Sequence, residues 1–88
     1  MPRKRATSIK SDEFLRNWVE DYFAKRPKTR IESISYLVDQ MLWDGVRFPT
    51  RHSDAMDAFE KLGFKLHSDR NQYGALLRTY VLAPGKET

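Results

Sequence analysis

Lysine and arginine side chains are the groups of this chain whose type and spacing first suggest a chemical role. The chain has 88 residues, with 16 Lys and Arg against 12 Asp and Glu, and a net charge of +4. One basic cluster, with no acidic residue among the first ten positions, comprises Arg3, Lys4 and Arg5. A second cluster around Pro27 comprises Lys25, Arg26, Lys28 and Arg30. Clustered cations favour a polyanionic partner, of which nucleic acid is the commonest.

The remaining residue types give little support to enzymatic chemistry. The chain contains no cysteine, which excludes disulfides, cysteine zinc sites and thiol nucleophiles. Its two histidines, His52 and His67, are expected to be exposed, and neither belongs to an HExxH or similar metal-binding spacing. No serine lies in a nucleophile motif. We therefore expect no enzyme activity, no metal site and no cofactor.

Length and hydropathy limit the architecture and the cellular compartment. A chain of 88 residues suffices for one small domain. No apolar run approaches the roughly 18–20 residues that span a bilayer. No apolar signal-peptide core follows the basic N-terminus. Together with the lack of cysteine, these features predict a soluble, cytoplasmic protein that has no membrane partner.

The first helix is predicted from a stripe of large apolar residues at helical spacing. The stripe comprises Phe14, Leu15, Trp18, Val19, Tyr22 and Phe23. Ser11 is the expected N-cap, and Pro27 stops the helix because the residue before a proline avoids the helical region. Residues 1–10, which lack apolar periodicity, are interpreted as a flexible basic arm.

A second helix is predicted from about Arg30 to Asp44. Thr29 and Glu32 have the spacing of a capping box, and apolar residues then continue at helical spacing. Gly45 supplies the left-handed end. Off its apolar stripe lie two aromatic residues, Tyr36 and Trp43, which suit a protein contact or base stacking.

The rest of the chain predicts a third helix followed by a β-hairpin. An extended link at 46–49 leads to a helix that Thr50 or Ser53 is expected to cap. Gly63 is expected to end this helix, and Phe64 to fold back onto its last turn. Residues 64–67 alternate apolar and polar as a strand does. Residues 68–72 are a polar turn, 75–82 form a second strand, and 84–88 form a tail.

Three helices followed by a hairpin are the element order of a compact winged helix. The third helix running into the hairpin through Phe59–Leu66 resembles the recognition helix and first wing strand of winged-helix nucleic-acid-binding domains. The segment Arg70–Gly74 is similar to the wing of small winged-helix units at the C-termini of phage and plasmid primase-helicases. The resemblance covers roughly residues 11–83 and implies an α+β fold, a winged helix-turn-helix of three helices with a C-terminal β-hairpin wing. The link at 46–49 is longer than the family's tight turn.

Three groups of residues are the candidate nucleic-acid contacts. The third helix would enter a major groove, and its candidate residues are Thr50, Arg51, His52, Ser53 and Lys61. The hairpin tip would follow a groove or backbone with His67, Arg70, Asn71 and Gln72. The basic arm and the turn near Pro27 would neutralise phosphates through Arg3, Lys4, Arg5, Lys28 and Arg30.

Two functions from different classes remain open at this point. The first is a small DNA-binding protein, a transcriptional regulator or replication accessory factor, with duplex DNA as the favoured partner. The second is a protein-binding module, such as a phage- or plasmid-type effector that docks on a host protein. Its motivation is the acidic middle of the chain together with Tyr36 and Trp43. A homodimer through the first or second helix is a further possibility.

Overall fold

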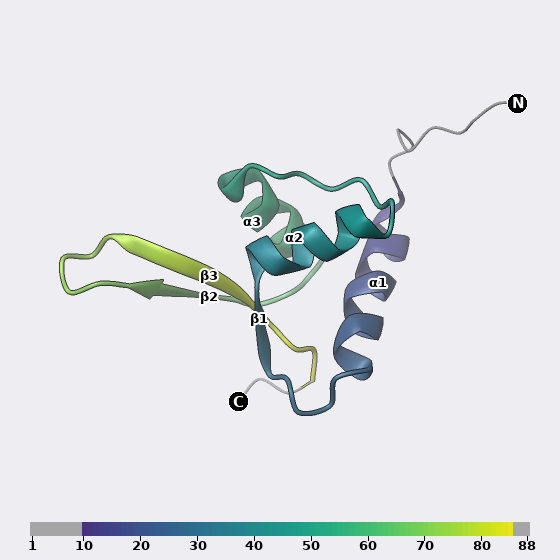
Figure 1. The fold of residues 1–88 in the computed structure, drawn as a ribbon, viewed down its shortest axis with the longest axis horizontal. Coiled ribbons are helices and arrows are strands. Elements are labelled where there is room, and N and C mark those ends of the chain that lie inside the picture. The colour runs from purple at the N-terminus through teal and green to yellow at the C-terminus, as the bar shows by residue number, and fades with distance from the viewer. Residues whose placement is uncertain (1–9, 86–88) are drawn as a thin grey trace, which may run out of the picture.

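The described part of the chain consists of three helices and three strands. A computed structural model describes residues 10–85 of the chain. In chain order the elements are α1 (Asp12–Ala24), β1 (Ile31–Ser33), α2 (Ile34–Trp43), α3 (His52–Lys61), β2 (Leu66–Arg70) and β3 (Leu76–Leu82). The helices lie together, and the β2–β3 hairpin projects from them on one side (Figure 1). No helix of the described part is long and apolar enough to cross a membrane.

Helix α1 begins where the sequence predicted. The Ser11 hydroxyl accepts a hydrogen bond from the Phe14 backbone N–H at 3.1 Å, so this N-cap is confirmed. Of the predicted apolar stripe, four residues are buried: Leu15, Val19, Tyr22 and Phe23. Trp18 packs partly buried against the core, whereas Phe14 is 42% exposed. The core-facing stripe of α1 is therefore narrower than predicted.

The segment before α2 is a strand, and the predicted capping box is wrong. Residues 31–33 form β1, which pairs antiparallel with β3, and Ser33 rather than Thr29 caps the helix. The Ser33 hydroxyl accepts from the Tyr36 N–H at 3.2 Å. Glu32 instead accepts a hydrogen bond from the Tyr22 hydroxyl at 2.9 Å. Helix α2 thus begins at Ile34, about four residues later than predicted.

Helix α3 starts without the predicted cap and ends as predicted. Arg51 is its N-cap and makes no side-chain capping bond, so neither Thr50 nor Ser53 has that role. At the other end Gly63 has a φ of +96°, which favours glycine. The Phe64 N–H donates to the Phe59 carbonyl oxygen at 3.1 Å, and the two rings pack with centroids 6.4 Å apart. This is the expected Schellman ending.

The sheet is antiparallel with the strand order β1-β3-β2. Strand β2 runs to Arg70, so residues 68–70, predicted as turn, belong to a strand. Arg70 lies opposite Leu76 after a bulge at the distal end of the hairpin. Three helices with a three-stranded antiparallel sheet form a small α+β fold that is compatible with a winged helix.

The link between α2 and α3 is part of the core. Val46 and Phe48 are both buried, and the Phe48 ring lies 4.8 Å from that of Phe59, centroid to centroid. Buried apolar contacts of this kind hold a connection that would otherwise be mobile. The length of the link, greater than in a tight helix-turn-helix, therefore does not leave α3 loosely attached.

Candidate nucleic-acid interface

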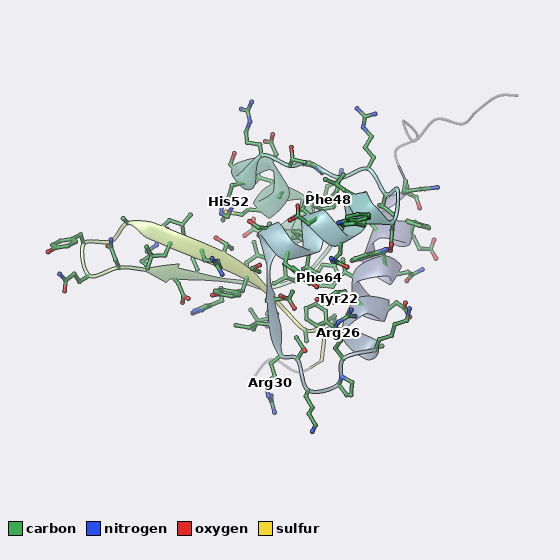
Figure 2. The ribbon with its side chains drawn as sticks, in the orientation of Figure 1. Tyr22, Arg26, Arg30, Phe48, His52 and Phe64 are labelled. Atoms are coloured by element: carbon green, nitrogen blue, oxygen red, sulfur yellow. The ribbon has the colours of Figure 1, made fainter. Side chains whose placement is uncertain are left out.

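The N-terminal end of α3 is joined to the hairpin by a side-chain hydrogen bond. His52 Nε2 lies 3.1 Å from the hydroxyl oxygen of Thr79 on β3. Thr79 is only 1% exposed, and its hydroxyl also lies 3.4 Å from the Ser68 hydroxyl of β2. His52 is half-buried, which corrects the expectation of an exposed ring; Figure 2 shows it at the end of α3 beside the sheet. This contact sets the position of α3 relative to the hairpin.

Arg70 lies on the same face of the hairpin as this contact. Alternate residues of a strand share a face, and the bulge adds its extra residue, Leu77, to β3, so Leu66, Ser68 and Arg70 of β2 are on one side. Leu66 packs against the core and Ser68 reaches Thr79, which identifies this side as the one that faces α3. Arg70 is exposed, and its Nη1 donates to the Gly74 carbonyl oxygen at 2.9 Å. Its charge therefore lies over the tip of the hairpin.

The tip is shaped by Asn71. Its side-chain oxygen accepts from the backbone N–H groups of Tyr73 at 2.8 Å and Ala75 at 3.0 Å. This Asx-type turn occupies the side-chain oxygen of Asn71, a residue that the sequence predicted as a nucleic-acid contact. Gln72 and Tyr73 are exposed beside it, and Tyr73 is 84% exposed.

Helix α3 presents a mixed surface to solvent. Thr50, Arg51 and Ser53 are exposed around its first turn, where Arg51 Nε lies 3.9 Å from an Asp54 carboxylate oxygen. Farther along, the exposed charged residues are Asp57, Glu60 and Lys61. Lys61 Nζ lies 4.0 Å from an Asp12 carboxylate oxygen of α1. Each end of α3 therefore carries one exposed cation, Arg51 or Lys61, and each of them lies within 4.0 Å of a carboxylate oxygen.

The other candidate residues lie apart from this face. His67 alternates with Ser68 and so lies on the opposite side of the hairpin, 3.0 Å from an Asp69 carboxylate oxygen. Lys28 and Arg30 are exposed in the loop between α1 and β1, and Figure 2 shows Arg30 at the far end of the molecule from His52. The predicted arm residues Arg3, Lys4 and Arg5 lie outside the described residues.

Sequence reasoning overlooked two further cations of the hairpin region. Lys65 immediately precedes β2, and Arg78 is exposed on β3 opposite Asp69. Residues 65–82 thus carry three Lys or Arg against one Asp. The signal that could have found Arg78 is its place in a run of strand-forming residues. The hairpin region is thus net positive, but Arg78 shares the side of Asp69 and His67, so its charge faces away from α3.

Within residues 10–85, no group of three or more His, Asp or Glu side chains is arranged to hold a metal ion. Comparisons of the chain with protein-family models, with curated protein sequences and with solved structures found no match.

Proposed function

We propose that this protein binds duplex DNA as a small winged helix, acting as a transcriptional regulator or replication accessory factor. The observation that carries the proposal is the His52–Thr79 contact, which holds the exposed start of α3 against the hairpin on the face that bears Arg70. The hairpin then acts as the wing. The element order α1-β1-α2-α3-β2-β3 and the strand order β1-β3-β2 support this assignment.

The charge distribution limits how α3 meets DNA. Recognition helices of this type contact base edges mainly with their N-terminal residues. Thr50, Arg51, His52 and Ser53 occupy that end together with Asp54, which lies 3.9 Å from Arg51 Nε. Asp57 and Glu60 follow about one and two turns later. In the proposed mode the first turn of α3 enters the major groove, the hairpin follows the backbone, and the arm with Arg3, Lys4 and Arg5 neutralises phosphates.

A salt-series binding titration with the full chain tests the proposal. Affinity for mixed-sequence duplex, measured by fluorescence anisotropy from about 50 to about 200 mM salt, is expected to fall linearly on a log–log plot. Arg51→Ala and Arg70→Ala should each weaken binding and reduce the salt slope by about 1. A single-stranded probe of the same sequence should bind more weakly than the duplex.

Lys28→Ala is the matched control, because it removes one exposed positive charge from the α1–β1 loop, which lies at the opposite end of the molecule from α3 in Figure 1. It should leave duplex affinity nearly unchanged. No binding at low salt would contradict DNA binding altogether. An equal loss for Lys28→Ala, Arg51→Ala and Arg70→Ala would contradict the proposed face.

A second candidate, the protein-binding module, is favoured by the acidic side chains on α3. Asp54, Asp57 and Glu60 are all exposed, and such a surface suits a basic protein better than a phosphate backbone. This function predicts that Asp57→Lys abolishes binding of a purified partner protein while Arg70→Ala leaves it intact. The DNA-binding function predicts that Asp57→Lys strengthens binding to duplex DNA.

A further inference from the structure

Helix α2 is apolar around most of its circumference. Its ten residues include one charged side chain, Asp39. The inner face buries Ile34, Leu37, Val38 and Met41 in the core. A helix that is apolar on all sides is normally buried on all sides. In the described part of the protein, however, most of the outer face of α2 is open to solvent, although the ring of Tyr36 packs edge-on against Tyr22 of α1.

The outer face carries two aromatic side chains spaced two turns apart. Tyr36 and Trp43 lie at positions i and i+7, about 10.5 Å along the helix axis, and so share one side of α2. Trp43 is 84% exposed and Tyr36 is 44% exposed. Asp39 and Gln40 lie between them on the same side, at i+3 and i+4. Beside Trp43 an open hollow of about 390 Å³ is lined by Asp39, Leu42 and Trp43.

This pattern is complementary to itself. When two copies of α2 pack antiparallel about a two-fold axis that passes between Asp39 and Gln40, residues equally far from the axis lie opposite each other. Tyr36 then faces Trp43 of the second copy, and the Asp39 carboxylate faces the Gln40 amide of the second copy. Both aromatic pairs and both carboxylate–amide hydrogen bonds form at once. No like charges are brought together at these positions.

We propose that the outer face of α2, formed by Tyr36, Asp39, Gln40 and Trp43, is the interface of a symmetric homodimer. The C-terminal end of α2 lies far from the tip of the hairpin in Figure 1, so this dimer leaves the hairpin tip free. Asp39, nearer the middle of α2, lines a hollow together with Thr50 and His52, so the interface adjoins the first turn of α3. The inference does not depend on DNA binding. A symmetric dimer would present two hairpins and two α3 helices in a fixed two-fold relation.

Sedimentation of the full chain over a wide range of concentrations tests the interface. The wild-type chain is expected to dimerise, and Trp43→Ala should raise the dimer dissociation constant at least about thirtyfold, as expected when an aromatic side chain buried by the interface is removed from both copies. Tyr73→Ala is the matched control, because Tyr73 is also an aromatic residue that is 84% exposed, but it lies at the hairpin tip. Tyr73→Ala should leave the dissociation constant unchanged. Far-ultraviolet circular dichroism checks that both variants remain folded.

Charge substitutions at Gln40 test the two-fold register. Gln40→Glu sets a carboxylate against Asp39 of the second copy and should weaken the dimer, whereas Gln40→Lys forms an ion pair there and should strengthen it. Both effects should diminish at high salt. A wild-type chain that is monomeric at every concentration overturns the proposal and leaves the face to a different partner. Equal effects of Trp43→Ala and Tyr73→Ala, or of the two Gln40 variants, overturn it as well.

Discussion

Tyr22 links α1 to the sheet through its hydroxyl group. The hydroxyl donates to Glu32 Oε1 at 2.9 Å, and the Arg26 guanidinium lies 3.8 Å from the centre of the ring (Figure 2). Burial, reinforced by the hydrogen bond to Glu32 and by its negative charge, raises the pKa of Tyr22 well above its ordinary value. The folded protein therefore retains the Tyr22 proton at a pH where the unfolded chain has lost it.

This difference predicts a pH-dependent contribution of Tyr22 to stability. Below about pH 9 the contribution is fully present, and Tyr22→Phe should cost about 1 kcal/mol through the lost hydrogen bond. As the pH rises above about 10, the unfolded chain ionises first, so the wild-type protein loses stability that the variant does not lose. Urea unfolding at about pH 8 and about pH 11 should show the gap between the two proteins closing by about 1 kcal/mol. A gap that stays constant would contradict this role.

At the junction of β1 and α2, strand pairing with β3 overrides the capping-box pattern of Thr29 and Glu32. Residues 31–33 align with Leu82, Val81 and Tyr80 of β3, and the helix starts only after this alignment ends. The Glu32 side chain, which a capping box would place against the Thr29 backbone, points to Tyr22 instead. Pairing with β3 extends the backbone of residues 31–33, so the first position free to cap α2 is Ser33.

Alanine substitutions at Ser33 and Thr29 test which of these two residues caps α2. Ser33→Ala removes the hydrogen bond to the Tyr36 N–H and should cost about 1 kcal/mol of unfolding free energy. Thr29→Ala should cost less, since Thr29 does not cap α2. Ser35→Ala, an exposed change within the helix, is the control and should cost nothing. Chemical denaturation followed by circular dichroism measures all three, and a larger loss for Thr29→Ala than for Ser33→Ala would contradict the structure.

One apolar core connects the helices and the sheet. Phe59 of α3 is fully buried, and its ring packs between Phe48 of the α2–α3 link and Phe64 before β2. Val81 and Ala83 bring β3 and the segment after it into the same cluster. Because all three helices and β3 contribute to this cluster and Leu66 of β2 packs against it, the described part of the chain should unfold as a unit.

Phe59→Ala should therefore destabilise the whole molecule. A buried phenylalanine replaced by alanine costs about 3–5 kcal/mol, a large share of the stability of a domain of this size. The control is Phe14→Ala, which removes the same ring from an exposed position on α1 and should cost less than about 1 kcal/mol. Thermal unfolding, followed at once by circular dichroism and tryptophan fluorescence, should shift in a single transition. Separate transitions for helix and fluorescence signals would contradict the single core.

Local features of the sequence were sufficient to predict several of the elements. The N-cap at Ser11, the glycine-terminated end of α3 and the order of the three helices before the hairpin were all identified, because each depends on residues close together in the chain. The exposure of Tyr36 and Trp43 was also predictable, since it depends only on helical spacing within α2. The candidate residues of the first turn of α3 and of the hairpin tip likewise came from local pattern alone.

Only the tertiary structure determined which of these residues lie together. Strand β1 forms because it pairs with residues 80–82, which are about fifty positions later in the chain. A pattern within three residues cannot predict such a long-range pairing. The half-buried position of His52 depends in the same way on Thr79, which is 27 residues away. The separation of Lys28 and Arg30 from α3 also follows from the fold, because charges are grouped by how the core packs and not by their order along the chain.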